Sequence, residues 1–196
     1  MKRDIILAGV GGQGILTIAN VIGLASIDAG LFIKQAEVHG MSQRGGDVHS
    51  DMRISDKEIA SDLIPEGKCD LIIAVEPMES LRYVAMLDDE GWLVTNTTPY
   101  VNIDNYPDMV DVLKEIEAIP NHIAIDADKI AKSLGSHRSA NMVILGAASP
   151  FIGISKEKLK NAIKKLFGSK GDKVVELNLK AFDEGRKVAD ARYTNS

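Results

Sequence analysis

The feature that most constrains the fold is a glycine-rich turn between two apolar segments at the start of the chain. Residues 5–8 are continuously apolar, which is typical of a buried strand, and residues 15–22 carry apolar side chains at helical spacing. The turn between them reads Gly9-Val10-Gly11-Gly12-Gln13-Gly14. At a strand-to-helix junction such glycines permit a tight turn, a close approach of the backbone to a phosphate, and close packing of the helix on the strand.

Two interpretations of this turn stay open. It is suited to a phosphate held at the N-terminus of the following helix, and it is also suited to tight packing alone. Glu37 follows about 20 residues on, at the end of a predicted strand over residues 32–37, where a dinucleotide-binding protein places a ribose-binding carboxylate. A free-standing Rossmann-type protein that binds NAD or FAD is therefore one hypothesis.

The segment that follows Glu37 weakens that hypothesis, because it is not a simple turn. It reads Val38-His39-Gly40-Met41-Ser42-Gln43-Arg44-Gly45-Gly46, which is unlike an ordinary nicotinamide-binding chain. In an open α/β sheet this segment would lie beside the glycine turn, at the carboxyl edge. Arg44 could bind a phosphate or carboxylate through two N–H groups, or it could pair with a local acid while Gly45 and Gly46 form a turn. His39 flanks the segment and is a possible ligand contact.

Strand-like and helix-like segments alternate along the first two thirds of the chain. Strands are predicted over residues 5–8, 32–37, 48–54, 70–75, 91–96 and 121–126, and helices from residue 15, over 77–87 and over 109–118. The strand at 48–54 alternates apolar and charged residues, as expected near a sheet edge. This order predicts a doubly wound, mainly parallel, Rossmann-like α/β sheet with helices on both faces.

The C-terminal third reads as helical, with predicted helices over residues 129–134, 141–148, 156–167 and 173–190. Ser155 is a suitable N-cap and Gly168 a suitable stop for the third of these. Asn141 begins an apolar helix that contains Gly146, which indicates close packing against another backbone. Asn178, Ala181 and Gly185 share a helix face, which indicates close packing within the chain or across a subunit boundary.

The composition of the chain argues against several classes of protein and of binding site. A net charge of -5 and no basic run interleaved with aromatic residues argue against nucleic-acid binding. One cysteine, Cys69, cannot form an internal disulfide or ligate an iron–sulfur cluster alone, and it suits a reducing compartment. No apolar run is long enough to span a membrane, and no histidine has metal-ligand spacing; His122 is predicted to be structural. We expect one domain over residues 1–196, located in the cytoplasm.

Taken together, these segments resemble the small, gamma-type subunits of the 2-oxoacid:ferredoxin oxidoreductases, over nearly the whole chain. The resemblance is carried by the turn at residues 9–14, the block 37–46, residues 70–77, Gly91, the helix that begins at Asn141, and the Asn178–Gly185 face. The His-Gly-Met-Ser-Gln form of the second block is more similar to the aryl-pyruvate (indolepyruvate) branch than to the pyruvate or 2-oxoglutarate branches.

The resemblance implies a division of labour between two chains. A large partner subunit would carry thiamine diphosphate, magnesium and [4Fe–4S] clusters, pass electrons to ferredoxin, and use coenzyme A as co-substrate. This chain would bind no cofactor or metal by itself, would contain no catalytic residue, and would be inactive alone, although it could self-associate. Its expected cofactor-binding or partner-facing residues are Gly9, Gly11, Gly12, Gln13, Gly14, Glu37, His39, Gln43, Arg44, Gly45, Gly46 and Asn141.

Overall fold

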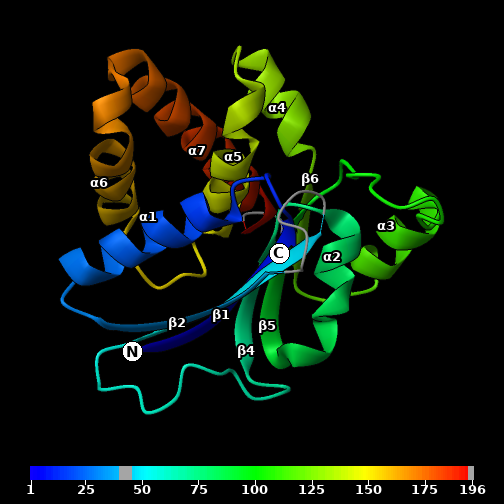
Figure 1. The fold of residues 1–196 in the computed structure, drawn as a ribbon, viewed down its shortest axis with the longest axis horizontal. Helices are drawn as coiled ribbons and strands as arrows, with labels where there is room; N and C mark the ends of the chain where they lie inside the picture. The colour runs from blue at the N-terminus through cyan, green and yellow to red at the C-terminus, as the bar shows by residue number, and fades with distance from the viewer. Residues whose placement is uncertain (40–45, 194–196) are drawn as a thin grey trace.

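The computed structural model describes residues 1–39 and 46–193, without the side chains of residues 39 and 193. The strands of this part form one six-stranded sheet in the order β2-β3-β1-β4-β5-β6 (Figure 1). The strands are β1 (Lys2–Val10), β2 (Phe32–His39), β3 (Asp47–Ser55), β4 (Cys69–Ala74), β5 (Leu87–Asn96) and β6 (His122–Ile125). β1, β4, β5 and β6 are mutually parallel, whereas β3 is antiparallel to both β1 and β2. The predicted mainly parallel α/β sheet is confirmed, with β3 as its one reversed strand.

Helices cover both faces of this sheet, as the doubly wound architecture requires. They are α1 (Ile15–Asp28), α2 (Pro77–Arg82), α3 (Met109–Glu117), α4 (Ala127–Ser133), α5 (Ala140–Ala148), α6 (Lys156–Phe167) and α7 (Asp172–Tyr193), with 3-10 turns η1 (Val84–Met86), η2 (His137–Ser139) and η3 (Gly168–Lys170). From β6 to residue 193, all secondary structure is helical, as predicted for the C-terminal third. Ser155 caps α6, since its Oγ accepts a hydrogen bond from the backbone N–H of Lys158 at 3.4 Å.

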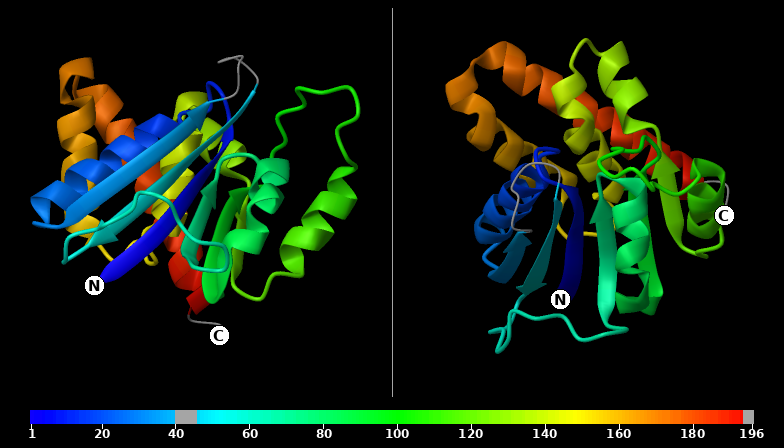
Figure 2. Two further views of the ribbon diagram at one scale, coloured as in Figure 1. Left: turned by 60° about the horizontal axis from the view of Figure 1, so that its bottom comes forward. Right: turned by 45° about the vertical axis from the view of Figure 1, so that its right-hand side comes forward.

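Alternation along β1 sends successive side chains into two separate cores. Ile5 and Leu7 join the larger core under α1, α5, α6 and α7, whereas Ile6 and Ala8 join the smaller core under α2 and α3. Figure 2 shows the two groups of helices on opposite sides of the sheet. Because β1 is buried on both faces, it reads as a continuous apolar run. β3 alternates buried and half-buried residues and lies next to the edge strand β2, as its sequence pattern predicts.

The long C-terminal helix α7 crosses α5 at a pair of glycines. A Cβ built on Gly185 would lie 1.8 Å from the carbonyl oxygen of Val143, and one built on Gly146 would lie 2.0 Å from that of Phe182. No side chain larger than hydrogen fits between two backbones at that separation. The close helix packing predicted at both glycines therefore occurs within the chain.

The predicted helix over residues 77–87 is wrong in its second half. Pro77 opens α2 as expected, but the helix ends at Arg82, η1 follows, and Leu87 already belongs to β5. Leu87 pairs with Cys69 across an irregularity in the β4–β5 ladder. Backbone pairing with β4 therefore outweighs the helical propensity of this stretch, a tertiary contact that a local pattern does not contain.

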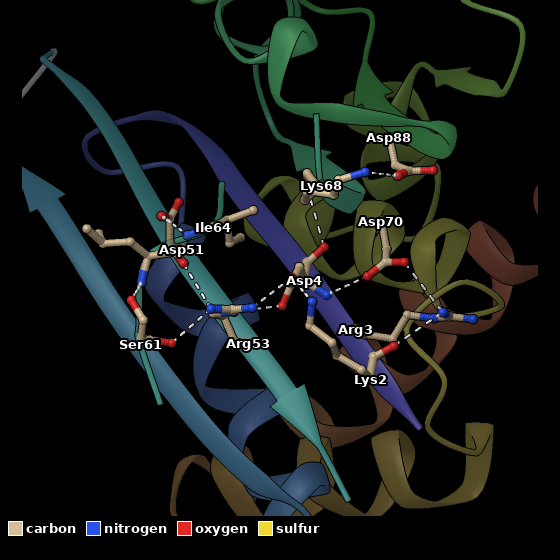
Figure 3. Close-up of polar contacts among 12 residues, drawn as sticks. Lys2, Arg3, Asp4, Asp51, Arg53, Ser61, Ile64, Lys68, Asp70 and Asp88 are labelled. Carbon is tan, nitrogen blue, oxygen red and sulfur yellow. Dashed lines mark hydrogen bonds and ion pairs between the residues drawn. The ribbon is translucent and has the colours of Figure 1, made fainter. Parts of the chain in front are cut away.

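The amino edge of the sheet carries a charged cluster that the sequence did not reveal (Figure 3). Asp4 is fully buried, and its Oδ1 accepts a hydrogen bond from Arg53 Nε at 2.8 Å. Arg53 Nη1 also donates to the carbonyl oxygens of Ser61 and Leu63, both at 3.0 Å. Because these carbonyls belong to the long loop between β3 and β4, Arg53 ties that loop to the sheet.

Within the described residues, no helix is both long and apolar enough to cross a membrane.

Candidate functional site: a cleft at the carboxyl edge of the sheet

The main cleft, of about 630 Å³, opens at the carboxyl ends of β1, β4 and β5. Its walls are the glycine turn, the start of α1, η2 with the start of α5, and η3 with the first turns of α7. After β1 the chain moves toward β2 on one side, whereas β4 lies on the other side of β1. The cleft therefore stands at the point where the strand order reverses, which is where open α/β sheets bind their ligands.

Gln13 braces the glycine turn with its own side chain. Its Oε1 accepts a hydrogen bond from the backbone N–H of Val10 at 2.8 Å, and its Nε2 donates to the carbonyl of Val75 at 3.4 Å. The side chain therefore links the ends of β1 and β4. Gly9 sits so close that an added Cβ would be 2.4 Å from Val75 Cγ2. Both residues hold the turn's shape, and Gly12 and Gln13 line the cleft.

Gly14 and Asn141 meet at the start of α1. Gly14 has a left-handed backbone with φ of 85° and is the N-cap of α1, so it needs the freedom of glycine. Asn141 Nδ2 donates a hydrogen bond to the carbonyl of Gly14 at 3.2 Å, which joins α5 to the turn. Asn141 Oδ1 is buried in the cleft wall and accepts no hydrogen bond from any described residue. A buried acceptor of this kind favours a ligand or water that donates an N–H or O–H.

The cleft also contains polar groups that the sequence analysis did not single out. Arg138 of η2 and Lys170 of η3 bring positive charge to its wall, and Asp128 at the start of α4 brings negative charge. Asn96, at the end of β5, donates through Nδ2 to Asp128 Oδ2 at 2.7 Å and accepts through Oδ1 from the N–H of Ala127 at 3.1 Å. Only Asn96 carried a usable signal, as a polar residue that ends a predicted buried strand.

Glu37 lies within β2 rather than at its end, and β3 separates it from the strand that leads into the glycine turn. Because β3 separates β2 from β1, Glu37 stands two strand spacings, roughly 10 Å, from β1. Its Oε1 accepts a hydrogen bond from Gln35 Nε2 at 2.6 Å. In a dinucleotide-binding sheet the corresponding strand is adjacent to β1.

The second sequence feature is described only at its ends. His39 is the last residue of β2, and Gln43, Arg44 and Gly45 lie outside the described residues. The carbonyl of Gly46 accepts a hydrogen bond from the N–H of Gly11 at 2.9 Å. The predicted adjacency of the block and the glycine turn is therefore confirmed at Gly46.

Two further residues have structural roles. His122 Nδ1 lies 2.6 Å from the carbonyl oxygen of Ile119 and its Nε2 lies 3.2 Å from Arg192 Nη2, which fits the predicted structural role. Burial raises the pKa of the Cys69 thiol to about 12, and Cys69 Sγ donates to the carbonyl of Leu71 at 3.2 Å. Among residues 1–39 and 46–193, no group of three or more His, Cys, Asp or Glu side chains could hold a metal ion.

The comparison with protein families decides the classification. The family model for pyruvate ferredoxin/flavodoxin oxidoreductase matches residues 4–188. The chain belongs to this family. The indolepyruvate oxidoreductase subunit IorB of Pyrococcus horikoshii is 38% identical over 198 residues, which cover 96% of each chain.

Solved structures of the family share the fold. The 2-oxoglutarate:ferredoxin oxidoreductase of Magnetococcus marinus, solved with 2-oxoglutarate, coenzyme A and succinyl-CoA bound, matches with a TM-score of 0.76 and 29% identity. That match covers 97% of this chain but only 31% of the other. The keto/oxoacid ferredoxin oxidoreductase gamma subunit of Geobacter sulfurreducens matches with a TM-score of 0.69 and 28% identity, over 96% of this chain and 99% of that one. The chain is thus a subunit of an oxidoreductase complex in the 2-oxoacid family, and its relatives imply partner subunits.

Proposed function

We propose that this chain is the cluster-free subunit of a thiamine-diphosphate-dependent indolepyruvate or aryl-pyruvate:ferredoxin oxidoreductase, and that its cleft holds coenzyme A. In the overall reaction the 2-oxoacid loses carbon dioxide, two electrons pass to ferredoxin, and the acyl group bonds to the sulfur of coenzyme A as its thiol proton is released. The proposal rests on one observation. The cleft combines a helix N-terminus, two basic side chains and the unpartnered acceptor of Asn141.

These groups suit the chemistry of coenzyme A. Its phosphates are anions, which favour the N-terminus of α1 and the side chains of Arg138 and Lys170. Its pantetheine amides and its adenine amino group are N–H donors, which could satisfy Asn141 Oδ1. The cleft volume of about 630 Å³ is in the range of small-molecule sites.

We assign thiamine diphosphate, magnesium and the clusters to the partner subunit. A [4Fe–4S] cluster needs about four thiolates, whereas this chain has one cysteine, and Cys69 is buried in the core of the sheet. A reduced, buried thiol also suits the cytoplasm, where we place the complex. On this basis the isolated chain is inactive.

The alternative function, NAD or FAD binding by a free-standing protein, is supported by the glycine turn but not by its surroundings. Glu37 is too far from the turn to reach a ribose whose phosphate sits at α1, because β3 intervenes. Titration of the isolated chain with NAD and FAD tests this alternative, and binding in the micromolar range would revive it.

The direct test is an anaerobic assay of the complex co-expressed with its large subunit, using indolepyruvate, coenzyme A and a viologen acceptor. We expect the Arg138→Ala/Lys170→Ala variant to raise the KM for coenzyme A about tenfold or more, with the KM for indolepyruvate unchanged. Lys165→Ala is the matched control, since Lys165 stands on α6 outside the cleft. An unchanged KM for coenzyme A in the double variant would refute the assignment of the cleft.

Arg44 is tested in the same assay. We propose that it adds a further contact to a phosphate of coenzyme A or an ion pair that holds the loop. A phosphate contact predicts that Arg44→Ala raises the KM for coenzyme A at constant kcat. If both parameters match those of the wild type, Arg44 has no role at the site.

A further inference from the structure

The loop from β5 to α3, together with the first turn of α3, presents an unusual concentration of exposed apolar side chains. Tyr100, Val101, Ile103 and Val110 are 45%, 67%, 42% and 73% exposed, and we name these four residues the β5–α3 patch. They are four of the ten large hydrophobic residues that are exposed in the described part of the chain, yet they fall within eleven positions. Figures 1 and 2 show this loop standing out from the body of the protein. Apolar side chains gathered this way mark an interaction surface.

The inner side of the same loop is fixed by buried polar contacts. Glu76, the N-cap residue of α2, is fully buried, and its Oε1 accepts hydrogen bonds from the Tyr100 N–H at 3.2 Å and from the Tyr106 hydroxyl. Burial and this contact with Glu76 hold the pKa of Tyr106 well above its usual value. Thr98 Oγ1 donates to Asp126 Oδ1 at 3.2 Å. The apolar side chains are therefore displayed on a loop that is already anchored, which lowers the entropy cost of binding.

The loop that carries the patch begins beside the cleft. Asn96 lines the cleft, and its Nδ2 donates to the carbonyl of Thr98 at 3.5 Å, two residues before Tyr100. Both features lie at the carboxyl edge of the parallel strands. A protein that covers the patch would therefore lie at the same edge of the sheet as the cleft.

The charged residues around the patch indicate which kind of protein could bind to it. Asp104, Asp108 and Asp111 are exposed around the patch, and no Lys or Arg occurs between Arg82 and Lys114. A symmetric dimer through this surface would set the same acidic groups against each other, which is repulsive. The acidic border instead favours a partner with Lys or Arg around an apolar pocket.

We propose that the β5–α3 patch docks the separate chain that carries thiamine diphosphate, through an apolar pocket on that chain bordered by basic residues. The proposal rests on the proposed function. It is supported by the Magnetococcus marinus match, in which this fold makes up 31% of one longer chain. In the Pyrococcus horikoshii relative, 96% of which aligns with this chain, the corresponding domain is a subunit by itself, and such a subunit is held to its partner by its surface alone.

The test uses the co-expressed complex, with dissociation on dilution followed by mass photometry. Val101→Asp/Val110→Asp places charge in the patch, and Asp is well tolerated at position 110 in the first turn of α3. Leu63→Asp is the matched control, because Leu63 is 63% exposed on the loop at the opposite edge of the sheet. We expect the dissociation constant of the complex to rise about 100-fold for the double variant and by less than about threefold for the control. The thermal unfolding of the double variant and of the control should match that of the wild-type chain.

The experiment distinguishes failure of the patch proposal from failure of the proposed function. If the wild-type complex forms and the double variant binds equally well, or if the control weakens it as much, the patch is wrong and the proposed function stands. If the wild type binds no thiamine-diphosphate-carrying chain, the proposed function and the patch fail together. Loss of self-association in the double variant, without an effect on the complex, would identify a second copy as the occupant and overturn the proposal.

Discussion

The crossing of α5 and α7 makes a sharp prediction about glycine. Replacement of a glycine by alanine in the middle of a helix normally stabilises a protein by up to about 1 kcal/mol, because alanine restricts the unfolded chain. At Gly185 the added Cβ would lie 1.8 Å from the carbonyl oxygen of Val143, 2.7 Å from its carbonyl carbon and 3.0 Å from the N–H nitrogen of Ala147. All three are backbone atoms, so no side-chain rotation can make room.

The helices would have to separate by more than 1 Å to restore ordinary contact. Overpacking of a core costs typically about 1–3 kcal/mol and occasionally more, and separation also forfeits dispersion contacts along both helices. After subtraction of the gain in helix propensity, we expect Gly185→Ala to lower the free energy of unfolding by about 3 kcal/mol. Gly23→Ala on α1 is the matched control, since its Cβ would meet only Ile33 Cδ1, at 3.6 Å. That variant is expected to gain about 0.5–1 kcal/mol.

Urea unfolding measures both changes. Far-UV circular dichroism reports the helices, and Trp92, the single tryptophan, reports the core near α5 because it stacks on Phe151 at 4.1 Å. With a slope of about 2 kcal/mol per molar urea, the midpoint of Gly185→Ala should fall by roughly 1.5 M. The close crossing would be refuted if Gly185→Ala were as stable as the wild type while Gly23→Ala behaved as expected.

Three further predictions concern the core and its edges. Asp4→Leu should cost about 3 kcal/mol, because it leaves the largely buried Arg53 without its carboxylate partner. Asp4→Leu together with Arg53→Met should cost clearly less than the two single losses summed, because the two side chains interact directly; additive losses in urea unfolding would contradict the coupling. Native Cys69 should not react with a disulfide reagent at pH 8. Because the pKa of the thiol rises from 9.0 to about 12 on folding, the contribution of Cys69 to stability is complete below pH 9 and is lost toward pH 12. The free energy of unfolding of Cys69→Ala should therefore fall less steeply between these pH values than that of the wild type, by up to about 1.4 kcal/mol per pH unit. Equal slopes for the two proteins would exclude this. Ser155→Ala should lose about 1 kcal/mol with the loss of the α6 cap, and thermal unfolding at an unchanged midpoint would show that the cap contributes nothing.

The sequence by itself determined the architecture, because local patterns carry it. The continuous apolar run of β1, the glycine turn and the helical spacing that follows are readable without neighbours, and so are Pro77 at the start of α2 and Ser155 at the start of α6. The glycines at positions 146 and 185 also signalled close packing, since a helix interior tolerates glycine only at a cost.

Only the tertiary structure decided how these elements serve the site. The insertion of β3 between β1 and β2, which moves Glu37 away from the turn, depends on hydrogen bonds between strands distant in sequence. The same holds for the end of α2 at Arg82, where pairing with β4 takes over. Asn141 was a candidate from its sequence, but its contact with Gly14 spans 127 positions, and Arg138 and Lys170 gave no signal at all. A cleft is assembled from the ends of many elements, and local periodicity constrains each element's own conformation but not which ends meet.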